Sequence, residues 1–232
     1  EFEERACRFG GSATRATWVS SEELRCVSVP AEAPGAAFSL EVDFTGMSEL
    51  YGRATLHSLA PSDGLVRDGA LVLTEARSSQ ERSVVFDEPL MRHGRRRFRA
   101  SFDLFVGGGT GGEGVSACLG TLPDGPFGED GAGDGLCVLV RTHLGRLDVR
   151  YGGVLAARSP LATSTLRDRY VRFEVSYGLD GLGVSLDGVW HVRHLLLNAW
   201  APADDWRFGI GARTGESRID EHRVGKLELA AG

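Results

Sequence analysis

The 232-residue sequence has no long apolar run and only one asparagine, Asn198. No stretch approaches the roughly 18 apolar residues that a membrane-spanning helix needs, and the first residues lack the basic and then apolar layout of a signal peptide. We expect a soluble piece with no membrane span, and any targeting signal outside it. Basic residues are also few, 26 against 32 acidic ones, and the formal net charge of -6 argues against a nucleic-acid partner.

The four cysteines fall in two pairs of equal separation, Cys7 with Cys26 and Cys118 with Cys137. Neither pair has the roughly two- to four-residue spacing of a zinc half-site, which argues against metal ligation. Each cysteine lies in a short apolar or alternating run, where cross-strand disulfides can form. We expect two structural disulfides and an oxidising compartment, extracellular or at the cell surface. Four buried free thiols in a cytosolic protein are the alternative.

From Phe38 onward the sequence is a succession of strand patterns without a lasting helical stripe. Residues 97–106 alternate, which puts Phe98, Phe102 and Val106 on one face of a sheet and the charged residues on the other. Turn signals such as Asp180-Gly181 recur throughout. The pattern predicts an all-β, antiparallel two-sheet sandwich.

The C-terminal part resembles a known family of β-sandwiches. Residues 201–215 contain a Pro and a Trp before a strand that closes in Ala-Arg-Thr-Gly, and His222 follows. This is similar to the ending of legume-type (L-type) lectin domains. Residues 69–74 and the hairpin 170–186 resemble earlier strands of that family, in the same order. The resemblance implies a concanavalin-like jelly roll over residues 46–232.

Residues 1–45 resemble the second half of a TIG-type immunoglobulin-like domain, whose paired cysteines flank a short hairpin. The first strands of such a domain are missing, so the chain looks like an excerpt from a longer extracellular protein. We place the boundary at residue 45 and leave open whether the strand 38–44 belongs to the jelly roll.

The lectin resemblance implies a sugar-binding rim. Glu113, in a glycine-rich loop before the strand 115–119, stands at the position of the family's sugar-binding Asp, and the loop 131–135 would supply backbone donors. Tyr151 or Trp190 could offer a stacking face, although Trp190, Trp200 and Trp206 are expected in the core. The expected ligand-binding residues are Glu113, Gly133, Asp134, Arg141, Gly215 and Glu216.

The sequence departs from the family at its metal site. L-type lectins hold calcium and a transition metal just after the strand 136–142, but here Arg141 stands where the ligand Asp belongs and no Asn is near. A guanidinium cannot ligate a cation, so we expect no cofactor there and a pairing of Arg141 with Glu113 or Asp134. A single calcium in the acidic loop, at Asp124, Glu129, Asp130 and Asp134, is a tentative further expectation, and a merely solvated loop is its alternative.

Three classes of function remain open. The first is an extracellular carbohydrate-binding or adhesion module with glycans as partners. The second is a structural module of a large surface protein that binds a cell-surface protein and no glycan. The third is a glycoside hydrolase, which needs two opposed carboxylates. The glucanases of this fold carry Glu-x-Asp-x-x-Glu, whereas residues 41–46 end in Gly, so we do not expect an enzyme.

Overall fold

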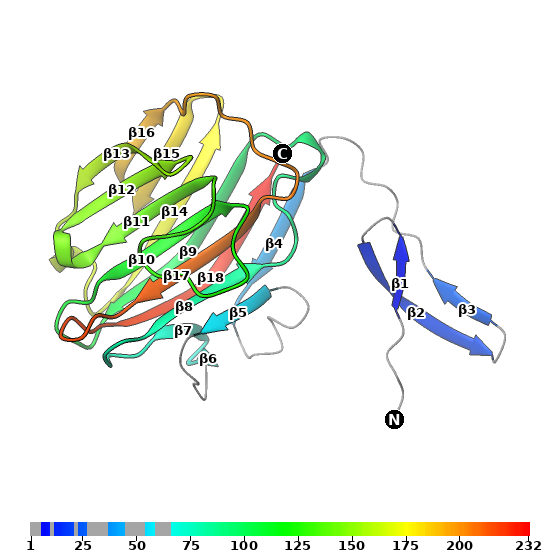
Figure 1. The fold of residues 1–232 in the computed structure, drawn as a ribbon, viewed down its shortest axis with the longest axis horizontal. Helices are drawn as coiled ribbons and strands as arrows, with labels where there is room; N and C mark the ends of the chain where they lie inside the picture. The colour runs from blue at the N-terminus through cyan, green and yellow to red at the C-terminus, as the bar shows by residue number, and fades with distance from the viewer. Residues whose placement is uncertain (1–5, 10–11, 21–22, 27–36, 45–53, 59–65) are drawn as a thin grey trace. The chain divides into compact units, whose positions relative to one another are not determined.

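The computed structural model describes residues 6–9, 12–20, 23–26, 37–44, 54–58 and 66–232. The chain divides into two compact units, residues 1–33 and 34–232 (Figure 1). Strand β4 (Phe38–Val42), which the sequence left open, pairs with the last strand of the chain and lies in the second unit. Among the described residues no helix is long and apolar enough to cross a membrane.

The first unit is a three-stranded antiparallel sheet in the order β1-β2-β3. Its strands are Ala6–Phe9, Ser12–Ser20 and Glu23–Cys26. Cys7 lies on β1 and Cys26 on β3, on either side of the central strand. Their side chains lie outside the described part of the structure, so this bridge stays a prediction.

The second unit consists of two antiparallel sheets, which confirms the predicted all-β jelly-roll sandwich (Figure 1). The seven-stranded sheet has the order β13-β12-β11-β10-β17-β8-β5. Its strands, in that order, are Val154–Pro160, Arg146–Tyr151, Leu136–Arg141, Gly114–Gly120, Arg207–Arg213, Glu81–Phe86 and Ala54–Ser58.

The eight-stranded sheet has the order β16-β15-β14-β9-β18-β7-β6, and β4 also pairs with β18. Its strands, in that order, are Val189–Leu195, Gly181–Leu186, Tyr170–Gly178, Phe98–Gly107, Glu221–Ala231, Ala70–Thr74 and Val66–Arg67. Three short 3-10 turns, Arg92–Gly94, Thr142–Leu144 and Thr163–Thr165, lie between strands.

The core between the sheets follows the alternation of the sequence. Phe98, Phe102 and Val106 of β9 are buried, as the alternation predicts, whereas Arg99 is exposed. Phe102 lies directly across from Phe173 of β14, with ring centroids 4.8 Å apart. Such stacked pairs add about 1 kcal/mol to the free energy of burial.

A second apolar cluster lies on the outer face of the seven-stranded sheet. Cys118 of β10 and Cys137 of β11 are directly opposed and form the predicted disulfide. The loop 121–135, which joins these strands, packs Phe127 over β17 at Gly211, where a Cβ would lie 2.6 Å from the Phe127 ring. Glycine is required there because the ring occupies the place of a side chain. The loop is thereby held against the sheet.

Removing the Cys118–Cys137 bond should destabilise the domain. The bond closes a loop of 19 residues, and closure of such a loop stabilises the folded state by about 3 kcal/mol. We expect the double variant Cys118→Ala/Cys137→Ala to lose about this much free energy of unfolding in urea titrations. Reductant should bring the wild type close to the variant. A reduced wild type as stable as the oxidised one would show that the bond contributes nothing.

Candidate functional site

Three strand ends meet at one edge of the seven-stranded sheet. Strand β10 begins where β11 and β17 end, because Gly114 pairs with Arg213 and Val115 with Val140. Glu113, just before β10, therefore faces the turn after β11, and His143 Nδ1 lies 3.1 Å from Glu113 Oε2 and 3.0 Å from its carbonyl oxygen. Gly215, just after β17, lies so close that a Cβ there would be 2.6 Å from Glu113 Oε1.

Asp130 is brought to the same edge by the loop 121–135. Its Oδ1 accepts a hydrogen bond of 2.5 Å from Arg141 Nη2, and its side chain is 56% exposed. Glu113, Asp130, His143 and Gly215 are called the rim site below. The rim site brings together two carboxylates and an imidazole, which are groups that bind hydroxyls. The side chains of Glu113 and His143 are 18% and 12% exposed.

Arg141 braces the rim site, but with partners other than those expected. The sequence predicted a pairing with Glu113 or Asp134, whereas the guanidinium binds Asp130 and lies with Nε 3.5 Å from Asp148 Oδ2. Asp148 is a buried carboxylate on β12, opposite Leu139 of β11. Of the two expected partners, Glu113 faces His143 instead, and Asp134 lies at the other end of β11.

Asp148 and Asp130 both keep their charge at neutral pH. Burial raises the pKa of Asp148, but a hydrogen bond from Arg158 and the charges of Arg146 and Arg141 outweigh it and hold the pKa below its usual range. Burial likewise raises the pKa of Asp130, and the hydrogen bond and charge of Arg141 more than reverse this. Both carboxylates that contact Arg141 are therefore negatively charged near neutral pH.

Gly133 and Asp134 do not join Glu113, contrary to the sequence prediction. Asp134 Oδ1 accepts a hydrogen bond from Thr121 N, 3.1 Å away, at the opposite end of β10 and β11. Arg141 is the last of the six residues of β11 and follows Asp134 by about 20 Å of extended chain. Glu216 lies beside Gly215 and is exposed, so of the predicted ligand residues only Glu113, Arg141, Gly215 and Glu216 share the rim end of the sheet.

The acidic loop residues do not fit a calcium site. Glu129 is buried and paired with Arg213 through two hydrogen bonds of 2.7 and 2.5 Å, and Asp130 is bound to Arg141. Asp124 is 94% exposed, and its Oδ1 lies 3.9 Å from Arg207 Nη2. In the described ranges no group of three or more His, Cys, Asp or Glu is placed to hold a metal ion.

A second buried carboxylate orders the glycine-rich loop that carries Glu113. Asp220 is fully buried and accepts hydrogen bonds from Gly111 N and Gly112 N. Both of its oxygens also bind Arg167, at 2.6 and 2.9 Å. A Cβ at Gly109 would lie 1.9 Å from the carbonyl oxygen of Ile219, so the loop can reach Asp220 only with glycine there.

His222 lies next to this carboxylate and is fully buried. The Thr74 hydroxyl donates to the Asp220 carbonyl oxygen, so it accepts from His222 Nδ1, 2.6 Å away. This leaves Nε2 as an acceptor without a partner among the described residues. Burial lowers the pKa of His222 to about 4, with opposing contributions from Asp220, which raises it, and Arg167, which lowers it.

The tryptophans divide into core and surface. Trp206 is buried and Trp200 is packed against the core beside Tyr151, whose hydroxyl donates to Ala199 O. Tyr151 is therefore part of an internal aromatic cluster. Trp190 is 40% exposed on the edge strand β16, so its expected place in the core was wrong. Edge-strand side chains that point away from the core have no second sheet to cover them.

Comparison with known proteins agrees on the fold. No protein-family model and no curated protein matches the chain. Among solved structures, the Ca2+- and mannose-bound VIP36 exoplasmic/lumenal domain is similar over 82% of this chain and 88% of that one, with a TM-score of 0.64 and 17% identity. Arcelin-5, a lectin-like defense protein from Phaseolus vulgaris, matches over 86% and 99%, with a TM-score of 0.61 and 13% identity.

The carbohydrate recognition domain of Emp47p is also similar, over 78% of this chain and 89% of that one, with a TM-score of 0.56 and 17% identity. At such identities the likeness shows the fold. The second unit thus has the fold of L-type lectin domains, as the ordered motifs of the sequence indicated.

Three residues of the site were not assigned their roles by the sequence. The sequence indicated no role for His143 or Arg213 and indicated Asp130 only as a calcium ligand. The single available signal was composition. A loop rich in acidic residues, in a domain with strands that end in arginine, predicts ion pairs without saying which residues form them.

Replacing Arg141 should unfold the domain more readily, whereas chelation should not. Arg141→Ala leaves the buried Asp148 with fewer cations and frees Asp130, a loss of roughly 3 kcal/mol. We expect a lower Tm by calorimetry and only partial recovery in Arg141→Lys, which keeps the charge but not the planar fork. EDTA should leave the Tm unchanged. The exposed Arg77→Ala is the control. A Tm that falls in EDTA while Arg141→Ala is neutral would refute the arginine brace.

The buried His222 should make stability depend on pH. In the unfolded chain a histidine binds a proton below about pH 6.5, whereas the folded pKa is about 4. The neutral form therefore stabilises the fold above pH 6.5, and this stability is lost as the pH falls toward 4, by up to about 1.4 kcal/mol per pH unit. Urea titrations of wild type and His222→Gln at pH 7 and 5.5 should show a smaller pH effect in the variant. His191→Gln is the matched control, and an equal effect in all three proteins would contradict the assignment.

Proposed function

We propose that residues 34–232 form a carbohydrate-binding module of the lectin type that binds glycans at the rim site. The observation that carries this proposal is the convergence of Glu113, His143 and Gly215 at three strand ends. A carboxylate with nearby imidazole and backbone groups can bind adjacent sugar hydroxyls. The fold likeness to VIP36, which was solved with mannose bound, supports this class of ligand.

Two features distinguish this proposed site from the metal-dependent lectin pattern. The loops would be held by Arg141 and Arg213, through Asp130 and Glu129, rather than by calcium. The module would also act by binding and not by catalysis, since residue 46 is Gly where a glycoside hydrolase of this fold needs its second Glu.

The setting of the module follows from the same reasoning. We infer an extracellular or lumenal location, supported by the Cys118–Cys137 disulfide and by the exoplasmic or lumenal origin of VIP36. The three-stranded N-terminal sheet would be the remaining part of a TIG-like domain.

The second candidate is a structural module of a large surface protein that binds another protein. It is favoured by the ion pairing of Asp130 and Glu129, which leaves Glu113 as the main acceptor.

The function can be tested on a glycan array. Wild-type protein should bind a subset of glycans, and titration calorimetry with the best of them should show at least a tenfold weaker Kd for Glu113→Gln, which loses a charged acceptor. Glu88→Gln, at an exposed position outside the rim site, should bind as the wild type does. If no glycan is bound while a protein partner is captured, the second candidate is correct.

A further inference from the structure

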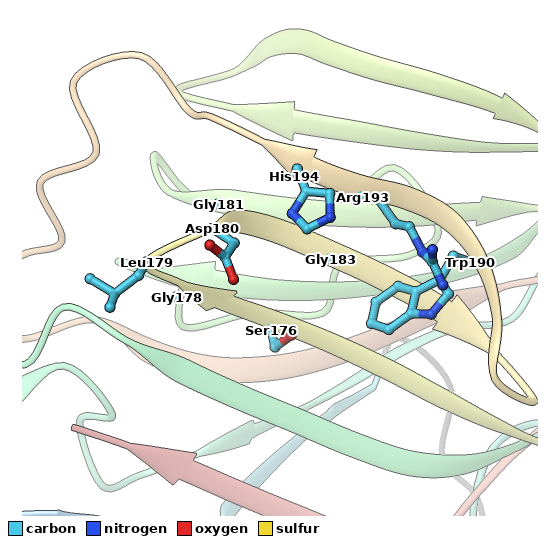
Figure 2. Close-up of a pocket in the computed structure, with 9 residues that line it drawn as sticks. All are labelled: Ser176, Gly178, Leu179, Asp180, Gly181, Gly183, Trp190, Arg193 and His194. Atoms are coloured by element: carbon cyan, nitrogen blue, oxygen red, sulfur yellow. The ribbon is translucent and has the colours of Figure 1, made fainter.

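A separate groove lies on the outer face of the eight-stranded sheet, at its β16 edge. Strands β14, β15 and β16 and the turn between β14 and β15 line this groove, whose volume is about 320 Å³. Figure 2 shows the residues that line it. This volume falls at the lower end of the range for small-molecule sites, roughly 300–1,000 Å³. The rim site belongs to the other sheet, so the groove is a different feature of the molecule.

The floor of the groove is open because its outward positions are small. Ser176 of β14 and Gly183 of β15 face away from the core, where their neighbours on either side are buried or packed inward. The Trp190 ring lies against Gly183, since a Cβ there would be 2.7 Å from Trp190 Cζ3. The Trp190 side chain is thus 40% exposed and lies beside a stretch of backbone that no side chain covers at Gly183.

An irregular strand directs two basic side chains into this groove. The pairing of β15 with β16 shifts register twice, and His194 has a left-handed backbone with φ of 54°. Bulges of this kind redirect side chains. Here Arg193 and His194, although consecutive, are both exposed and both line the groove (Figure 2). Strain of this kind outside a turn is common at binding sites.

The polar groups of the groove are not used by the fold. Asp180, Arg193 and His194 make no side-chain hydrogen bond or ion pair with any other residue of the described part of the chain. Arg193 instead rests with its guanidinium carbon 5.0 Å from the centroid of the Trp190 ring. An unpaired guanidinium held in place by an aromatic ring is preorganised for a planar anion such as a carboxylate.

We propose that this groove binds a saccharide unit that carries a carboxylate, such as a uronic acid. Arg193 binds the carboxylate through its planar fork. Asp180, His194 and Ser176 bind hydroxyls, and the exposed part of Trp190 packs against the apolar face of the sugar ring. The site is independent of the rim site, so neither proposal depends on the other.

The test uses the indole N–H signals of the four tryptophans in NMR spectra of the whole chain. Trp190→Phe assigns the Trp190 signal. Methyl glucuronide should shift that signal with a Kd at least tenfold lower than methyl glucoside, and Arg193→Gln should abolish this difference. Gly183→Ala, whose new Cβ displaces the ring, should weaken binding, whereas Leu196→Ala, an exposed residue outside the groove, should not.

Two results would overturn the proposal. One is an unshifted Trp190 signal, or equal Kd values for the charged and the neutral glycoside. The other is loss of the Trp190 shift in Glu113→Gln, which would place the saccharide at the rim site. An unchanged glucuronide Kd in Glu113→Gln supports the groove, whatever that variant does to binding on the glycan array.

Discussion

The rim of the second unit depends on one buried carboxylate and the arginines around it. Asp148 is 1% exposed and is surrounded by Arg141, Arg146 and Arg158. A buried charge of this kind is stable only when cations and hydrogen bonds replace the water it has lost. Arg141 meets that need and at the same time reaches Asp130. The interior of a strand is therefore linked electrostatically to the loop that lies over it.

The same arrangement recurs on both sides of Glu113. Arg167 clasps Asp220 and so fixes the glycine-rich loop before Glu113, while Arg213 clasps Glu129 in the loop that lies over the sheet. Each loop is attached to the framework by a carboxylate and a guanidinium, the pair whose geometry is most directional. Glycine lets the backbone of each loop adopt the conformation that it needs, and the ion pairs then hold the loop in that conformation.

The sequence predicted most of the fold and part of the site. Alternation identified the buried face of β9, and the order of weak motifs identified the sandwich, because both depend on local pattern and chain order. The path of the loop 121–135 could not be predicted. The path is set by the packing of Phe127 on Gly211 and by the pairing of Arg141 with Asp130 rather than with another carboxylate. These are tertiary contacts, which leave no periodic pattern in the sequence. The exposure of Trp190 was missed because nothing local marks β16 as an edge.

A brace made of side chains differs from one made of a bound ion in how it is supplied. The guanidinium of Arg141 belongs to the same chain as Asp130 and Asp148. Every molecule therefore carries one such guanidinium, and it cannot dissociate into solution as a bound ion can. Its effective concentration is set by the chain and not by the surroundings. The groups that hold the rim together are thus supplied by the chain itself and are brought into contact by its fold.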